Sequence, residues 1–210
     1  MVMKIVNLGH ASFLIEGKEI SVVTDPYRKG SVPHLKMPHV KANYVFCSHD
    51  HYDHDAADLV EIVHTDKHLK YETIRVAHDH HDGAHRGLND MLLLEIDGYR
   101  ILHTGDLGCI PLKKILDKMK NVDILLAPIN GHFTISAKEL KAIMDTVHPK
   151  VTIPMHYFKK ENKSGYPDGG QIDVFKELVG EYKEIDGYEI EVNDELLKNR
   201  VVIFNKELQE

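Results

Sequence analysis

Residues 48–54 read Ser-His-Asp-His-Tyr-Asp-His, an HxHxDH pattern that begins directly after a short apolar run. Three imidazoles and a carboxylate within this short pattern are more than packing requires. A neutral imidazole nitrogen binds Zn²⁺ or a similar divalent ion at about 2.0 to 2.1 Å, and alternate residues at the end of a strand can point at one ion. His49 and His51 therefore predict a metal site at a strand end. The next pair in the pattern, Asp53 and His54, can reach a second ion.

Three further candidate ligands lie downstream, where β-favouring runs give way to loops. A site with two metal ions needs ligands from several segments, and strand ends can supply them. The candidates are His78 after 73–77, Asp106 after 99–103 and His156 after 151–153.

An opening β-meander and a later hairpin are predicted from short apolar and β-branched runs. Gly17 marks the turn between the second and third runs, and Asp97-Gly98 is a strong signal for a two-residue hairpin turn. The expected strands are 5–8, 12–15, 19–23, 91–96 and 99–103.

Capping signals predict the helices. Asp55 is a candidate N-cap, Pro111 suits the first helical position because its φ is fixed, and Ser136 with Glu139 can form a capping box. The expected helices are 55–64, 111–119, 136–147 and 171–179.

Buried-looking strands at 123–127 and 150–153 flank the third expected helix, which is a βαβ pattern in a chain that begins as all-β. Periodicity alone therefore predicts a mixed α/β fold. The polar, glycine-containing segment 159–170 is expected to be a loop, either a rim over the metals or a solvated connector.

Composition favours one soluble domain spanning residues 1–210, with 42% hydrophobic and 28% charged residues. No apolar run approaches the length of a membrane helix, and the N-terminus lacks the long apolar region of a signal peptide. Two cysteines do not make a disulfide framework in a chain of this length. A cytoplasmic protein without membrane contact is expected, and its oligomeric state is open.

A formal net charge of −7 argues against nucleic acid as a partner, since that binding draws on clustered Lys and Arg. Bound divalent ions would make the local charge at the metal site positive, despite the negative net charge of the chain. The expected partner is a small-molecule substrate, anionic in character.

The ordered set HxHxDH, His, Asp, His resembles the metallo-β-lactamase superfamily, and within it the family of small metal-dependent hydrolases. The likeness spans about residues 3–158 and extends to ascorbate-phosphate lactonases and, more distantly, to phospholipases D that act on N-acyl ethanolamine lipids. The matching phrases are Leu8-Gly9-His10-Ala11-Ser12-Phe13, Thr24-Asp25-Pro26, His78-Asp79, His103-Thr104-Gly105-Asp106, Pro128-Ile129-Asn130-Gly131 and Ile153-Pro154-Met155-His156-Tyr157.

The resemblance implies an αβ/βα four-layer sandwich, in which two sheets pack face to face with helices outside. It also implies the metal ligands: His49, His51 and His78 for the first ion, Asp53, His54 and His156 for the second, and Asp106 bridging them. Such N and O ligands suit Zn, Mn, Fe or Ni. Zn²⁺ is the expected ion, with Mn²⁺ as the rival that the lactonases suggest.

His78 has competitors for its place, because His80, His81 and His85 follow closely. His78 alone directly follows the strand and matches the family phrase. The resemblance makes Asp79 a supporting residue whose carboxylate pairs with Arg86, although both residues also fit an ordinary charged surface.

Two residues near the start of the chain are predicted to support the site. Asp25 resembles an aspartate that accepts the free N–H of a ligand imidazole, which fixes the tautomer and raises ligand basicity. His10 resembles a pocket-lining residue that supports a ligand or touches substrate, and a turn histidine is the alternative.

Residues 130–132 (Asn-Gly-His) occupy the stretch where relatives usually carry Gly-Gly followed by an aromatic residue, so Asn130 and His132 depart from that pattern. If His132 faces the metals it can protonate a leaving group, a role that needs a pKa near the working pH.

The implied reaction is hydrolysis by a metal-bridging hydroxide, oriented by the catalytic carboxylates Asp53 and Asp106. Carbonyl carbon and phosphorus are both possible targets, so ester, lactone and phosphodiester bonds stay open. Di-iron oxygen or nitric-oxide reductases of the same fold usually carry a glutamate in place of the second histidine of the motif. His51 holds that position here, so a redox enzyme is disfavoured. The alternatives are a non-catalytic metal-binding or regulatory protein and a small phosphodiesterase or nuclease of the same fold.

Overall fold

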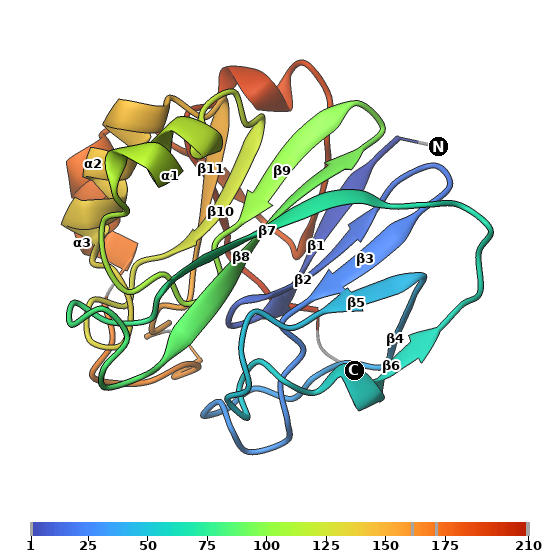
Figure 1. Cartoon of the computed structure of the whole chain (residues 1–210), viewed down its shortest axis with the longest axis horizontal. Coiled ribbons are helices and arrows are strands. Elements are labelled where there is room, and N and C mark those ends of the chain that lie inside the picture. Colours follow the sequence, from blue (N-terminus) through green and yellow to red (C-terminus); the bar gives the residue numbers. More distant parts are fainter. Residues whose placement is uncertain (1, 161, 171, 209–210) are drawn as a thin grey trace.

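The computed structural model describes residues 2–160, 162–170 and 172–208, so Glu161 of the expected loop and Gln171 of the expected last helix lie outside the described residues. Two five-stranded sheets pack face to face (Figure 1). The first has the order β13-β1-β2-β3-β5, with bounds Glu189–Glu191, Lys4–Gly9, Ser12–Glu16, Ser21–Thr24 and Tyr44–Phe46. The second has the order β11-β10-β9-β8-β7, with bounds Val151–Met155, Ile124–Pro128, Tyr99–His103, Leu88–Ile96 and Lys70–Ala77.

The main core lies between the two sheets because alternate residues of each strand point to the shared interior. Ile5 and Phe13 from the first sheet belong to one buried cluster with Leu94, Leu126 and residues of β11 from the second. The parallel strands β10 and β11 are buried along their whole length, as expected for strands covered on both faces.

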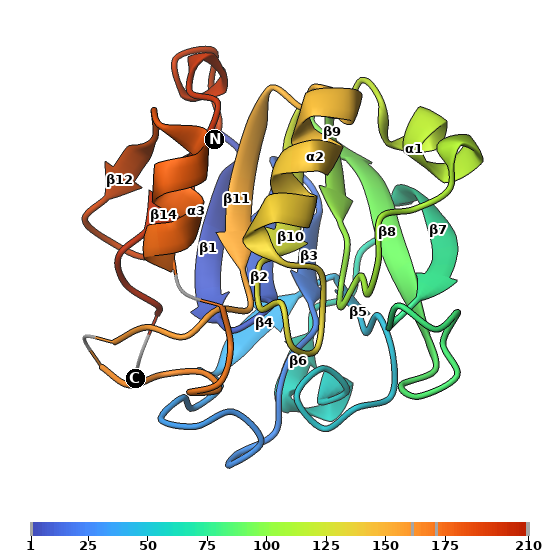
Figure 2. The same cartoon turned by 90° about the vertical axis from the view of Figure 1, so that its left-hand side faces the viewer.

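Three helices cover the outer face of the second sheet (Figure 2). Ser136 accepts from the backbone N–H of Glu139 and the Glu139 carboxylate accepts from the Ser136 N–H, so the predicted capping box is confirmed. None of the helices in the described part of the chain is long and apolar enough to cross a membrane. The bounds are α1 Lys113–Met119, α2 Ala137–Val147 and α3 Ile172–Val179.

The outer face of the first sheet is covered by loops and short strands. Tyr27, Val32 and Met37 pack on it in a separate buried cluster with residues of β4 (Val40–Ala42) and β6 (Val60–Ile62). The sandwich of two sheets with outer layers confirms the expected fold class.

The expected helix 55–64 is wrong. Only Ala57–Leu59 form a 3-10 turn, and Val60–Ile62 continue as a strand parallel to β4. The β-branched residues of this strand favour extended backbone, and pairing with β4 buries Val60. The N-cap signal at Asp55 was outweighed by this tertiary pairing.

The segment after residue 180 completes the fold. β13 pairs antiparallel with β1 at the edge of the first sheet. The short strands β12 (Lys183–Ile185) and β14 (Val202–Phe204) pair with each other, and Val201 bridges to Thr152 of β11. The C-terminal segment thereby packs along β1 of the first sheet and β11 of the second.

Candidate metal centre

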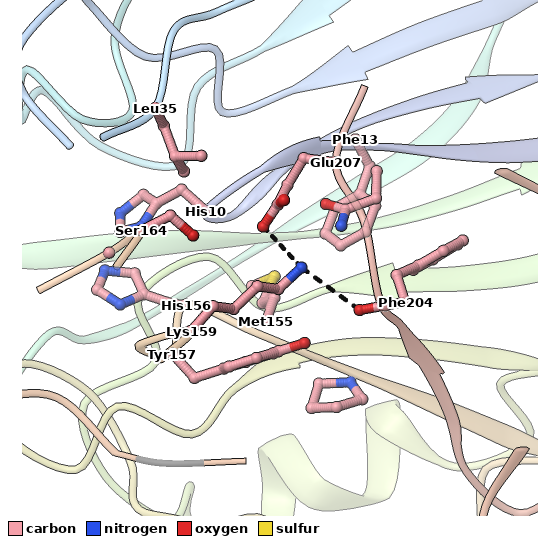
Figure 3. Close-up of a pocket in the computed structure, with 13 residues that line it drawn as sticks. His10, Phe13, Leu35, Met155, His156, Tyr157, Lys159, Ser164, Phe204 and Glu207 are labelled. Carbon is pink, nitrogen blue, oxygen red and sulfur yellow. Dashed lines mark hydrogen bonds and ion pairs between the residues drawn. The ribbon is translucent and has the colours of Figure 1, made fainter. Parts of the chain in front are cut away.

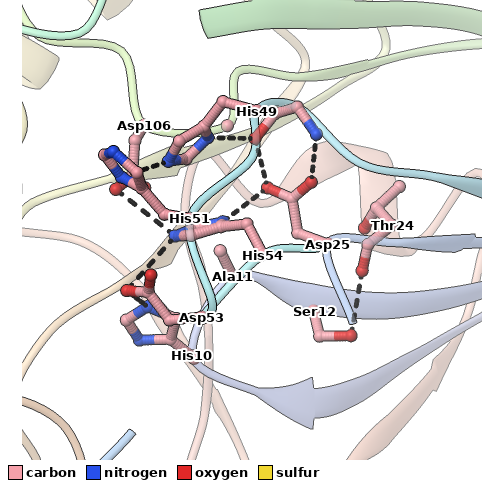
Figure 4. A network of polar contacts seen from close by, with 12 residues as sticks. His10, Ala11, Ser12, Thr24, Asp25, His49, His51, Asp53, His54 and Asp106 are labelled. Atoms are coloured by element: carbon pink, nitrogen blue, oxygen red, sulfur yellow. Dashed lines mark hydrogen bonds and ion pairs between the residues drawn. The ribbon is translucent and has the colours of Figure 1, made fainter. Parts of the chain in front are cut away.

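The candidate ligands gather where several strands end. β7 ends directly before His78 and β11 directly before His156, whereas β5 ends three residues before His49 and β9 three residues before Asp106. The turn between β1 and β2 adds His10 at the same place. Figure 4 shows His10, His49 and Asp106 of this set close to His54.

The seven residues expected as ligands form connected groups. Within each group one ligand atom of every residue lies within 4.8 Å of the others. The groups are His49, His51 and His78; His10, Asp53, His54 and His156; and His49, His54 and Asp106. The first group contains the ligands that the resemblance implies for the first ion, and the second group contains those implied for the second ion. The third group joins Asp106 to one member of each.

Asp106 lies at the centre of the cluster. Its Oδ2 is 3.3 Å from His54 Nε2, 3.4 Å from His78 Nε2 and 3.3 Å from His156 Nε2. Burial alone would raise the pKa of this carboxyl, but the imidazoles of His156 and His54 outweigh it and hold the pKa well below its ordinary value. The carboxylate is ionised, as a metal ligand must be.

Several atoms of the cluster are buried without a hydrogen-bond partner in the described part of the chain. They are His54 Nε2, both ring nitrogens of His78 and His156, and Asp106 Oδ1. An unsatisfied buried polar atom costs about 1–3 kcal/mol, so this many would be unfavourable as a packing arrangement. His49 Nε2 and His51 Nδ1 also lie 2.9 Å apart, close enough for both to reach one ion. The donor set fits divalent metal ions.

Asp25 orients two of the imidazoles. Its Oδ2 lies 2.8 Å from His54 Nδ1 and 2.7 Å from the Ser48 hydroxyl, and its Oδ1 accepts from the Ser48 backbone N–H at 2.7 Å. The Ser48 hydroxyl lies 2.9 Å from His49 Nδ1. With both Nδ1 atoms occupied in this way, Nε2 of His54 and of His49 is left to face the centre.

The backbone is strained at this site. His10, Asp25 and His156 have φ values of 58°, 42° and 53°, in the left-handed region that side chains with a Cβ rarely adopt. Such conformations persist only where the surrounding structure enforces them, and they concentrate at functional sites.

His10 belongs to the second group. Its Nε2 lies 3.2 Å from Asp53 Oδ2, and its ring centroid is 3.8 Å from that of His156. Burial and the nearby His156 lower the pKa of His10 to about 4, so it is neutral at pH 7. It contacts a predicted ligand, as the supporting role requires, rather than acting as an isolated turn histidine.

The expected ion pair between Asp79 and the Arg86 side chain is wrong. The Asp79 carboxylate instead accepts the backbone N–H groups of His81, Gly83, His85 and Arg86 at 2.7 to 3.0 Å. Asp79 therefore shapes the turn after His78 and touches no ligand imidazole through these bonds. Four convergent N–H dipoles satisfy a carboxylate without a side-chain cation.

Asn89 positions Asp106. Its side-chain oxygen accepts the Asp106 backbone N–H at 2.8 Å, and its amide donates to Thr104 O at 2.8 Å. His103 is structural as well, since its ring nitrogens lie 2.8 Å from Ala11 O and 3.2 Å from the Gly105 N–H.

The histidines that could compete with His78 lie outside the ligand groups found among the described residues. His78 is fully buried, whereas His80, His81 and His85 are exposed and His80 bonds Glu139 at 2.7 Å. The location of these side chains supports His78 over its neighbours.

His132 does not face the metal cluster. Its side chain is 56% exposed and lies 3.7 Å from Asp168. The Asn130 side-chain oxygen accepts the backbone N–H groups of both His132 and Phe133 and turns the loop so that Phe133 points inward. The suggested role of His132 as general acid required this side chain to face the metals, and it does not.

A cavity of about 170 Å³ opens over the cluster. Four of its lining residues, His51, Asp53, Asp106 and His156, are predicted ligands, and the other three are Arg86, Phe133 and Tyr166. The Tyr166 hydroxyl lies 3.0 Å from Asp53 Oδ2 and 2.9 Å from Ser31 O. The loop 159–170 thus supplies a rim residue, and a tyrosine in an otherwise polar, glycine-containing segment was the available signal for it.

A second, water-sized cavity of about 20 Å³ lies behind His10 and His156 (Figure 3). The Lys159 ammonium group closes it through a 2.6 Å ion pair with Glu207 and a contact to Phe204 O. Sequence patterns had not singled out either member of this nearly buried pair.

Gly108 lies against the backbone of the turn after His78, and Gly108→Ala is expected to destabilise the protein. An added Cβ would lie 2.0 Å from Asp79 N and 2.1 Å from His78 C, atoms that cannot move independently. Such overpacking costs about 1–3 kcal/mol or more and displaces His78. We expect a lower free energy of unfolding in urea and less bound metal. Gly187→Ala, where an added Cβ meets nothing within 4 Å, is the control, and equal behaviour of the two variants would contradict the prediction.

Comparison with known families is consistent with this geometry. A family model for the beta-lactamase superfamily domain matches residues 4–156. The chain therefore belongs to the metallo-β-lactamase superfamily.

Among its relatives are proteins named metal-dependent hydrolase. One from Carboxydothermus hydrogenoformans is 29% identical over 193 residues, which cover 74% of this chain and 84% of the relative. One from Thermococcus kodakarensis is 27% identical over 219 residues, covering 87% and 95%.

Solved structures give the same family and fold. A Thermotoga maritima protein assigned as a Zn-dependent hydrolase of this superfamily has a TM-score of 0.75 and 27% identity, covering 96% of this chain and 98% of the other. A Parabacteroides distasonis protein, 18% identical with a TM-score of 0.65, covers 99% and 94% and shares the fold. The predicted class, a metal-dependent hydrolase of this superfamily, is confirmed.

Proposed function

We propose that this chain binds two divalent metal ions and hydrolyses an ester, lactone or phosphodiester bond of a small anionic substrate. The first ion would be held by His49, His51 and His78, and the second by Asp53, His54 and His156, with Asp106 shared. Zn²⁺ is the proposed ion and Mn²⁺ its rival, because imidazole and carboxylate ligands suit both.

The buried, unpaired ligand atoms support this proposal most strongly. Imidazole nitrogens and a carboxylate oxygen of the cluster are buried close to one another without hydrogen-bond partners among the described residues. Metal coordination is the interaction that satisfies such a set.

Divalent ions held by these residues would supply Lewis acidity and would lower the pKa of water, the chemistry that hydrolysis at neutral pH needs. The chain's own groups hold the reacting partners in place. Asp25 accepts from His54 and keeps its Nε2 directed inward. The Tyr166 hydroxyl, within donating distance of Asp53 Oδ2 and Ser31 O, helps to hold the Asp53 carboxylate in place at the cavity wall.

The size of the cavity limits the substrate. Pockets for drug-sized ligands measure about 300–1,000 Å³, and the cavity over the cluster measures about 170 Å³. A small molecule, or one small reactive group of a larger molecule, fits this space.

Metal content is the first test of this function. Protein purified without chelator is expected to contain two divalent ions per chain by elemental analysis. It should hydrolyse members of a lactone, ester and phosphodiester panel, with Zn²⁺ and Mn²⁺ compared on the same preparation. Chelated protein should lose turnover and recover it with metal.

The outcomes separate the competing functions. Two bound ions without turnover across the panel would favour a metal-binding or regulatory role. Protein that does not bind added Zn²⁺ or Mn²⁺ would overturn the ligand assignment. Turnover confined to phosphodiesters would favour a small phosphodiesterase.

A further inference from the structure

Three loops bring non-ligand side chains to the mouth of the metal cavity. Arg86 comes from the turn after β7, Phe133 from the loop after β10 and Tyr166 from the loop after β11. The Arg86 guanidinium lies 4.2 Å from the centroid of the Phe133 ring, and the Phe133 and Tyr166 rings are in edge contact with centroids 5.4 Å apart. The other four residues that line the cavity are predicted metal ligands.

The Arg86 guanidinium differs from the other arginines of the chain. Each of the other four donates to a carboxylate or a backbone carbonyl: Arg28 to Asp55, Arg75 to Asp90, Arg100 to Lys120 O and Asn121 O, and Arg200 to Asp145. In the part of the chain that the structure describes, the Arg86 side chain has the Phe133 ring as its partner and no carboxylate. Its N–H groups are left to face the cavity or solvent.

Asp79, in the same turn, makes no ion pair with the Arg86 side chain among the described residues. The Asp79 carboxylate is already occupied by four backbone N–H groups, including that of Arg86 itself. The turn therefore holds the Arg86 backbone in place and leaves its guanidinium without a carboxylate in direct contact among the described residues. Stacking on Phe133 orients the planar guanidinium at little cost in hydrogen-bonding capacity.

We infer that Arg86, stacked on Phe133, is a specificity-determining residue that binds a non-reacting anionic group of the substrate, a carboxylate or a phosphate. The inference rests on the proposed hydrolytic function and names its substrate class. A guanidinium presents paired N–H donors that match carboxylate and phosphate oxygens in a two-point contact. The scissile bond would lie over the metal ligands and the anionic group against Arg86, within the same cavity.

Charge supports an anion at this position. The chain has a formal net charge of −7, so a cation without a carboxylate partner at the mouth of a cavity is unusual in this protein. Such a cation next to bound metal ions attracts anions and raises their local concentration.

The test compares Arg86→Gln with Arg200→Gln, whose parent side chain pairs with Asp145 on the surface. The first readout is the dissociation constant of glutarate and of methyl phosphate, measured by calorimetry on the protein as purified. We expect Arg86→Gln to weaken binding of at least one anion by about 10- to 100-fold, the range for charge-assisted hydrogen bonds, and Arg200→Gln to leave it unchanged. The two probes distinguish a carboxylate from a phosphate site.

The second readout is kcat/KM on a matched pair of esters, 4-nitrophenyl hemiglutarate and 4-nitrophenyl valerate. Arg86→Gln should lower kcat/KM for the charged ester about 10- to 100-fold while the neutral ester changes less than about 3-fold. Arg86→Lys should recover part of the loss, since it keeps the charge without the fork. Phe133→Leu, which removes the stacking surface, should show a smaller loss in the same direction.

Unchanged anion binding in Arg86→Gln, or equal losses on both esters, would overturn the inference. Thermal unfolding of each variant shows whether the fold is intact, and Phe133→Leu supplies a second route if Arg86→Gln is unstable. Anion binding that depends on Arg86 in a protein without turnover would uphold the anion site and refute the hydrolytic function. The experiment therefore distinguishes failure of the anion site from failure of the proposed hydrolytic function.

Discussion

Asp106→Ala is expected to abolish metal-dependent hydrolysis, with a loss of about 1,000-fold or more in kcat/KM. Asp106 Oδ2 lies within 3.4 Å of three predicted ligand imidazoles, so its removal takes away the group that both ions would share. Metal ions stabilise a transition state by several kcal/mol, and each 1.4 kcal/mol is about tenfold in rate. Metal content should fall below two ions per chain. His51→Ala should act in the same direction.

The matched control is Asp66→Ala, which removes an exposed carboxylate away from the cluster. Steady-state kinetics and elemental analysis on the three variants decide the matter. If Asp106→Ala and His51→Ala hydrolyse the substrate as well as the unmodified protein, the activity belongs to a contaminant or to another site.

Asp25→Ala is expected to weaken metal binding by about 10- to 100-fold and to destabilise the fold. The buried Asp25 carboxylate is the acceptor for His54 Nδ1, the Ser48 hydroxyl and the Ser48 N–H. Without it the His54 ring loses its fixed orientation, and outer partners of this kind contribute one to two orders of magnitude to metal affinity. The stranded buried donors cost roughly 1–3 kcal/mol each, so the free energy of unfolding should fall by about 3 kcal/mol or more.

Chelator competition measures the change in metal affinity, and urea unfolding of the metal-free protein measures the change in stability. Asp123→Ala is the matched control, because Asp123 is also buried and accepts the Arg100 N–H, but it lies at the opposite end of β10 from the cluster. The control should lose stability and keep its metal affinity. A similar loss of affinity in both variants would mean that Asp25 acts only through the fold.

Much of the architecture could be predicted from local sequence. The Asp97-Gly98 hairpin and the Ser136 capping box formed as expected, because turn and cap chemistry involves residues close together in the chain. The segment 55–64 was mispredicted for the opposite reason. Its pairing partner Val40 is distant in sequence, and periodicity does not report such a partner.

The sequence by itself determined the chemical class of the site, since the HxHxDH spacing and the later His, Asp and His define a metal donor set wherever the strand ends meet. Only the tertiary structure decided which neighbouring side chains surround it. The Asp79 carboxylate accepts backbone N–H groups rather than the Arg86 side chain, which contacts Phe133. The turn at Asn130 places Phe133 rather than His132 at the cavity. Tyr166 reached Asp53 across a separation of 113 residues. Side-chain directions in loops depend on contacts between distant segments, whereas ligand spacing at a strand end is a local property of the chain.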